Sequence, residues 1–223
     1  MKPKKIFLVR HGQSQGNVDS AMCSHTPDYK LLLTELGKEQ AVQAGYTLKN
    51  IIGNESIQFY ISPLWRTRDT FKGLLTALKD NEFKYLEDPR IREQEWGHLK
   101  SVEESARVNK ERDEYGTFYY RIPDGESGAD VYDRVSTFME SMHRDFKKPD
   151  FPENVVIVSH GLAIRLFLMK WFHWTVEEFS QMKNPYNCQI FELLKNEKDK
   201  YDLITKIIPH SEPDIHANPL IIR

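Results

Sequence analysis

Asn-Val-Val-Ile-Val-Ser, residues 154–159, is the stretch that decides the fold. It is a short, continuous and mainly β-branched run, which is typical of a strand buried on both faces of a parallel sheet. Apolar residues fill nine of the eleven positions 162–172 that follow it. A helix that is apolar all round is a buried helix. A buried strand followed at once by a buried helix predicts a layered α/β core.

Strands and helices alternate outward from that core. Two more continuous apolar runs, 5–9 and 57–61, predict strands. Thr34 and Ser127 stand where N-caps are expected, ahead of two helices. The order predicts a three-layer α/β sandwich with a mostly parallel central sheet flanked by helices. The other predicted elements are a helix that opens at 62–63, a weak strand at 83–87, a polar helix at 101–114 and a terminal strand pair at 187–194 and 201–204.

The 223 residues are predicted to form a single domain, with a helical insert at about 97–126 and an extended tail at about 205–223. Lys plus Arg is 31 and Asp plus Glu is 33, so the net charge is −2. That balance argues against bulk binding to nucleic acid or to an anionic membrane. No stretch has the length of a membrane span or of a signal peptide's apolar core, so the expected location is the cytoplasm. Cys23 and Cys188 are expected to be reduced thiols. Whether the protein forms a homodimer is left open.

Histidines and arginines follow three of the predicted strands. Arg10 and His11 come directly after the first strand, Arg66 follows the second, and His160 follows the strand at 154–159. Ligands of such sheets bind outside the carboxyl ends of the strands. We therefore expect the two imidazoles to meet in one cationic cup that is open to solvent.

This set of side chains suits phosphoryl transfer. Arginine donors match phosphate oxygens and stay charged. A neutral imidazole is a good nucleophile near pH 7, and a second imidazole can donate to a phosphoryl oxygen. The set predicts a covalent phosphohistidine, with arginines in place of a metal. A zinc site is not expected, because the other six histidines form no HxH or HExxH spacing. A phosphate site without turnover is the alternative.

Residues 8–17, Leu-Val-Arg-His-Gly-Gln-Ser-Gln-Gly-Asn, resemble the signature of the histidine phosphatase superfamily, also called the phosphoglycerate mutase-like family. Leu-Thr-Glu-Leu-Gly at 33–37, Ser-Pro-Leu-Trp-Arg at 62–66 and Ser-His-Gly at 159–161 are similar to further motifs of that family. The similarity extends from about residue 5 to residue 194. It implies a phosphoglycerate mutase-like fold.

The resemblance also implies roles for individual residues. His11 would be the phosphorylated nucleophile. Glu93, four residues before Gly97, would be the proton donor, with Glu95 as the alternative for that role. The other residues expected at the phosphoryl group or the substrate are Arg10, Gln13, Asn17, Arg66, Tyr120, His160 and Gly161.

The insert distinguishes two activities of the family. The family's mutases carry a longer insert with a Gly-Leu-Asn-Lys element and a paired arginine. Here residues 97–100 are Gly-His-Leu-Lys, and no Arg-Arg pair occurs between 97 and 126. Residues 118–134 and Asn187-Cys188 are instead similar to a fungal and plant branch of broad-range acid phosphatases.

The resulting prediction is a metal-independent phosphomonoesterase that acts on small phosphorylated metabolites without a cofactor. One alternative is a phosphoglycerate mutase, which would use 2,3-bisphosphoglycerate as its cofactor. The non-enzyme alternative is a phosphate-binding module on the same scaffold.

Overall fold

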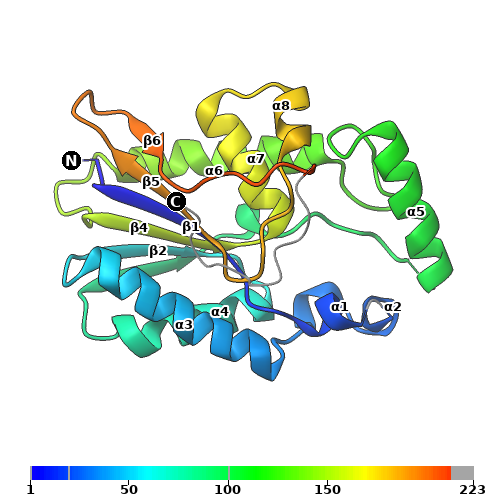
Figure 1. Cartoon of the computed structure of the whole chain (residues 1–223), viewed down its shortest axis with the longest axis horizontal. Coiled ribbons are helices and arrows are strands. Elements are labelled where there is room, and N and C mark those ends of the chain that lie inside the picture. The colour runs from blue at the N-terminus through cyan, green and yellow to red at the C-terminus, as the bar shows by residue number, and fades with distance from the viewer. Residues whose placement is uncertain (1, 20, 100, 212–223) are drawn as a thin grey trace.

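A six-stranded sheet forms the centre of the protein, with the strand order β3-β2-β4-β1-β5-β6 (Figure 1). The computed structural model describes residues 2–19, 21–99 and 101–211. Four strands pair in parallel, and the two strands at one edge are joined to them and to each other by antiparallel pairing. The prediction of a mostly parallel sheet is confirmed. The parallel strands are β1 (Lys5–Arg10), β2 (Ile57–Ile61), β3 (Phe83–Glu87) and β4 (Asn154–Ser159), and the antiparallel ones are β5 (Ile190–Lys195) and β6 (Tyr201–Leu203).

The register of the central strands places three chain segments at one edge. Arg10 of β1 pairs with Ser159 of β4, and Ile61 of β2 pairs with Val158. The residues that follow these three strands therefore leave the sheet side by side. All six residues of β4 are buried, as expected for the middle of a parallel sheet covered on both faces.

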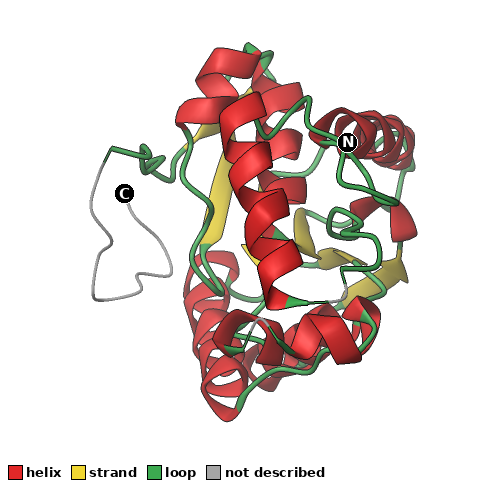
Figure 2. Cartoon of the chain, turned by 90° about the vertical axis from the view of Figure 1, so that its right-hand side faces the viewer, coloured by secondary structure: helices red, strands yellow, loops and turns green. Residues whose placement is uncertain are grey.

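Helices cover both faces of the sheet, which completes the three predicted layers (Figures 1 and 2). Alternate side chains of β1 enter opposite cores, because successive strand residues point to opposite faces. Phe7 packs with α3 (Glu35–Ile52) and α4 (Trp65–Leu78), whereas Leu8 packs with α6 (Gly128–Asp145) and α7 (Gly161–Phe172).

The insert lies outside these layers. Helix α5 (Val102–Tyr115) projects beyond the end of the sheet at which the parallel strands finish (Figure 1). Its one buried residue is Val108, which is why its sequence is polar almost throughout. Its position matches the helix predicted at 101–114.

Five short helical elements were not predicted, because three to six residues are too few to show a helical period. They are α1 (Gln15–Val18), α2 (Met22–His25), η1 (Asp28–Lys30), η2 (Pro89–Ile91) and α8 (Val176–Gln181).

The chain beyond β6 carries no helix or named strand as far as residue 211. Met182 and Pro209 form an isolated β-bridge there. The rest of the predicted extended tail, and the thiol of Cys23, lie outside what the structure describes. No described helix is both long and apolar enough to cross a membrane.

Candidate active site

The structure brings His11 and His160 together at the ends of β1 and β4. Their ring centroids are 5.2 Å apart and the rings are tilted by 60°. Ser62, at the end of the neighbouring β2, places its Oγ 2.7 Å from His160 Nε2. Three segments that lie far apart in the sequence thus contribute side chains to one point of the sheet edge.

His11 is held in one tautomer by its own loop. Its Nδ1 lies 2.7 Å from the carbonyl oxygen of Gly12. Because a carbonyl only accepts hydrogen bonds, Nδ1 carries the proton and donates. The lone pair of the neutral ring is therefore on Nε2. Gly12 holds this loop against α3, since an added Cβ would lie 2.3 Å from the Gly37 oxygen.

Both histidines are neutral near pH 7. Burial lowers the pKa of His11 well below its usual value, and the charges of Arg66 and Arg10 lower it further. The pKa of His160 is lowered well below its usual value by burial, Arg66 and His11. A neutral imidazole keeps a lone pair and can act as a nucleophile.

The two rings are more enclosed than the expected open cup. His11 is 3% exposed and His160 is 0% exposed. The expectation that both rings face solvent is therefore wrong for this structure. The reason is that both follow the innermost strands, which helices cover on both faces. His160 Nδ1 is buried and has no hydrogen-bond partner among the described residues, so it is a donor or acceptor available to a ligand.

Arg10 and Arg66 complete what we call the phosphoryl pocket, together with His11 and His160. Arg10 Nη1 donates to the Pro185 carbonyl, and its Nε is buried without a partner among the described residues. Arg66 is 4% exposed. Two guanidinium groups beside a neutral imidazole form a cationic site suited to a phosphoryl dianion.

Asp28 is a partner of Arg66 that the sequence analysis missed. Arg66 Nη1 donates to the Asp28 carbonyl at 2.8 Å, and Nη2 donates to the Asp28 carboxylate at 3.0 Å. Asp28 lies in the short turn η1. No periodicity or motif marks such a turn, so the sequence offered no signal for this contact.

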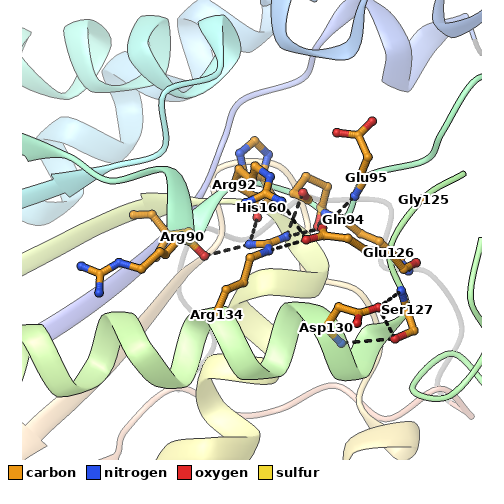
Figure 3. A network of polar contacts seen from close by, with 12 residues as sticks. Arg90, Arg92, Gln94, Glu95, Gly125, Glu126, Ser127, Asp130, Arg134 and His160 are labelled. Carbon is orange, nitrogen blue, oxygen red and sulfur yellow. Dashed lines mark hydrogen bonds and ion pairs between the residues drawn. The ribbon is translucent and has the colours of Figure 1, made fainter.

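Glu93 lies on the loop between η2 and α5, and a network centred on Arg134 of α6 holds that loop (Figure 3). The Arg134 guanidinium donates to the carbonyls of Arg90, Arg92 and Glu93 at 2.8, 2.8 and 3.0 Å. It also donates to both carboxylate oxygens of Glu126 at 2.9 Å.

Glu126 connects the same loop to the start of α6. It accepts hydrogen bonds from Arg92 Nη2 at 2.7 Å and from the backbone N–H of Glu95 at 3.0 Å. Glu95, the alternative proton donor, is exposed, whereas Glu93 is half-buried. The Glu93 carboxylate interacts electrostatically with Arg10 of the phosphoryl pocket. These observations favour Glu93 over Glu95.

The other expected site residues occupy different surroundings. Asn17 Oδ1 accepts from Ser14 and from Asn187 Nδ2, whose amide also donates to the His11 carbonyl. Gly161 begins α7 directly after His160. Gln13 Oε1 accepts from the Thr34 hydroxyl at 2.8 Å. Tyr120 donates to Glu111 of α5 at 2.6 Å, so its described polar contact is with the insert and not with the histidines.

Other surface features lie away from the two histidines. A cavity of about 450 Å³ is lined by residues of α8 and the tail, among them Met182 and Pro209, and it does not include the histidines. Among residues 2–19, 21–99 and 101–211, no group of three or more His, Cys, Asp or Glu side chains is placed to hold a metal ion.

Known proteins resemble this chain over almost its full length. It is 43% identical over 232 aligned positions to phosphoglycerate mutase-like protein AT74H of Arabidopsis thaliana, covering 96% of this chain and 81% of the relative. It is 29% identical to broad-range acid phosphatase DET1 of Saccharomyces cerevisiae, covering 93% of this chain and 90% of that protein.

Solved structures show the same fold. A mycobacterial glucosyl-3-phosphoglycerate phosphatase superposes with a TM-score of 0.71 at 22% identity, covering 90% of this chain and 96% of that one. The sequence model described as histidine phosphatase superfamily (branch 1) matches residues 6–203. That range contains both histidines, both pocket arginines and Glu93. The chain therefore belongs to the histidine phosphatase superfamily.

Proposed function

We propose that this protein is a metal-independent phosphomonoesterase that acts on small phosphorylated metabolites through a phosphohistidine. The observation that carries the proposal is the His11 ring. Its Nδ1 is bound to the Gly12 carbonyl, so Nε2 bears the lone pair beside two arginines and a second imidazole. The relatives include a protein named as a broad-range acid phosphatase, which supports hydrolysis as the reaction.

In the first step, the Nε2 lone pair of His11 attacks phosphorus, and the bond between phosphorus and the leaving oxygen breaks. Glu93 in its protonated form gives its proton to that oxygen, so the alcohol leaves neutral. Arg10, Arg66 and His160 Nδ1 stabilise the charge on the phosphoryl oxygens.

In the second step, the Glu93 carboxylate takes a proton from water, and the water oxygen attacks phosphorus. The phosphorus–nitrogen bond breaks, and its electron pair returns to Nε2. Inorganic phosphate leaves, and Glu93 is protonated again for the next cycle. The charge that a cation would neutralise in metal-dependent phosphatases is neutralised here by the two guanidinium groups.

The turn η1 contacts the phosphoryl pocket, because the carbonyl and the carboxylate of Asp28 accept hydrogen bonds from Arg66. An incoming phosphoryl group competes with that carboxylate for the same guanidinium.

Release of inorganic phosphate from p-nitrophenyl phosphate, with EDTA present throughout, tests the proposal. We expect turnover at an undiminished rate after the protein has been stripped with the chelator. Loss of turnover that returns with added Mg²⁺ or Zn²⁺ would refute metal independence. Binding of phosphate without any turnover would favour a phosphate-binding module.

A phosphoglycerate mutase is the second candidate, because a relative at 43% identity is named mutase-like. A mutase passes the phosphoryl group from His11 to a second hydroxyl and must exclude water. Conversion of 3-phosphoglycerate to 2-phosphoglycerate that depends on 2,3-bisphosphoglycerate would select this candidate. The cytoplasmic location and the homodimer stay predictions.

A further inference from the structure

Asn187 and Cys188, which are similar in sequence to the broad-range acid phosphatases, form a turn against the loop that carries the nucleophile. The backbone N–H of Cys188 donates to the carbonyls of Arg10 and His11 at 3.1 and 3.2 Å. The Asn187 side chain reaches the same loop, because its Nδ2 donates to the His11 carbonyl at 3.2 Å. The proposed reaction assigns no role to Asn187.

The same nitrogen makes a second hydrogen bond. Asn187 Nδ2 donates to Asn17 Oδ1 at 3.1 Å. An amide NH₂ group carries two N–H donors, so one side chain can serve both acceptors. Asn187 therefore links the backbone of the nucleophile to the side chain of Asn17, a residue that is expected at the phosphoryl group.

These contacts fix the direction in which the Asn17 amide faces. The Ser14 backbone N–H donates to Asn17 Oδ1 at 3.0 Å, and Asn187 donates to the same oxygen. Both partners are donors, so the Asn17 atom that meets them is the oxygen. The Asn17 NH₂ group therefore faces away from both, and it has no hydrogen-bond partner among the described residues. Two N–H donors are left for the oxygens of a ligand.

Asn17 depends on such contacts because its own helix is short. Helix α1 has four residues, none of them buried, and a helix of that length is not stable by itself. The Asn187 contact holds the Asn17 amide against the nucleophile loop. The His11 backbone, in contrast, is also held by the Ser159 carbonyl and by the Cys188 N–H. Loss of Asn187 should therefore affect Asn17 more than it affects the nucleophile.

We propose that Asn187 is a positioning residue, which holds the Asn17 amide in place beside His11 and thereby sets the affinity of the phosphoryl pocket for its anion. The proposal rests on the function proposed above and on the expected role of Asn17. The anion is one whose oxygens accept hydrogen bonds from an amide NH₂ group. Inorganic phosphate, the product of the proposed reaction, is its simplest form.

Calorimetric titration with inorganic phosphate, with EDTA present, measures this affinity without any turnover. Asn187→Ala removes both hydrogen bonds of the NH₂ group, and we expect the Kd of phosphate to rise by about five- to tenfold. The left-handed residue of the turn is Cys188, with a φ of 56°, so alanine at position 187 fits the backbone. If thermal denaturation shows that this variant is unfolded, Asn187→Ser takes its place, because a hydroxyl has one donor and cannot serve both acceptors.

Asn17→Ala separates an effect that acts through Asn17 from general damage to the turn. This substitution should itself raise the Kd of phosphate by about tenfold. In the double variant, Asn187→Ala should add less than about twofold, because the amide that it positions is already absent. General damage to the turn would instead raise the Kd by the same factor in both backgrounds.

Steady-state hydrolysis of p-nitrophenyl phosphate shows which kinetic constant changes. Asn187→Ala should raise KM more than it lowers kcat, since backbone hydrogen bonds still hold His11. Asn109→Ala is the matched control, because Asn109 Nδ2 donates to the Ser105 carbonyl on the polar helix α5. The control should leave the Kd of phosphate, KM and kcat unchanged.

Four results would overturn the positioning role. They are a Kd in Asn187→Ala within about twofold of the original, an equal effect of Asn187→Ala in both backgrounds, normal phosphate binding by Asn17→Ala, and a loss confined to kcat. A protein that binds phosphate but hydrolyses no phosphomonoester would count against the proposed function, and the titrations would still decide the role of Asn187. Absence of phosphate binding by the unchanged protein would count against both.

Discussion

The side chains around His11 come from the ends of three central strands and from the first turn of α4, whereas those around Glu93 come from an irregular loop and from helices. The parallel register of β1, β4 and β2 determines where the segments of the phosphoryl pocket lie. Glu93 depends on a clasp, by which we mean the Arg134 and Glu126 side chains that bind its loop (Figure 3).

This difference assigns the chemical step to the phosphoryl pocket and the choice of substrate to the region around Glu93. A sheet covered on both faces holds the backbone of Arg10 and His11 with hydrogen bonds that no single side chain controls. The Glu93 loop and α5 are fixed by side chains, so single substitutions can change them without disturbing the sheet. Changes in the pocket should therefore abolish the reaction, and changes around Glu93 should alter its selectivity and rate.

Replacement of the nucleophile is the severest test of the pocket. His11→Asn should lower kcat for p-nitrophenyl phosphate by at least about 10⁴-fold, because it removes the lone pair that forms the covalent intermediate. Acid-quenched trapping of labelled phosphate on the protein should detect the intermediate before the substitution and lose it afterwards. Activity within tenfold of the original would show that His11 is not the nucleophile.

Removal of the clasp should be the largest stability effect around Glu93. Arg134→Met leaves the Glu126 carboxylate, whose side chain is only 15% exposed, without its main partner. We expect a loss of about 3 kcal/mol in the free energy of unfolding and a lower kcat. Arg121→Met is the control, because its pair with Asp130 is 62% and 35% exposed and should contribute at most about 1 kcal/mol. Equal losses in thermal unfolding would contradict the clasp.

The role of Glu93 can be separated from that of the pocket by the leaving group. Glu93→Gln should lower kcat for an alkyl phosphate such as glycerol 3-phosphate by about 10²-fold or more, because the alkoxide needs a proton as it leaves. The loss for p-nitrophenyl phosphate should be smaller, since nitrophenolate leaves unprotonated. Equal losses for both substrates would remove Glu93 as the acid.

Sequence patterns predict the pocket better than the region around Glu93 for a physical reason. A buried parallel strand has a recognisable composition, and its carboxyl end is a known binding position, so His11, Arg66 and His160 could be placed together. The Asp28 contact and the Arg134 clasp depend on how irregular segments meet in space. No local periodicity of the sequence predicts such contacts. The burial of His160 likewise depends on the helices that cover both faces of the sheet.

The neutral histidines also make stability depend on pH. The pKa of His160 in the folded protein lies well below its usual value because of burial first and Arg66 second. Between about pH 6.5 and the lowered pKa, the unfolded chain therefore binds more protons than the folded one. Stability should fall as the pH falls through that window, by up to about 1.4 kcal/mol per pH unit for each such histidine. His160→Asn should flatten the slope measured by urea unfolding between pH 7 and pH 5, and an unchanged slope would contradict the neutral assignment.

The contact between the turn η1 and the pocket should give the smallest effect. In Asp28→Asn the carboxylate that occupies Arg66 becomes a neutral amide, which competes less strongly with a phosphoryl dianion. The ion pair is partly exposed on the Asp28 side, at 44%, so its contribution is at most about 1 kcal/mol. Inhibition by inorganic phosphate should therefore become about two- to fivefold tighter. Asp69→Asn, which removes an exposed pair with Lys72 on α4, should leave it unchanged. Weaker phosphate binding in Asp28→Asn would mean that Asp28 orients Arg66 for the substrate and does not compete with it.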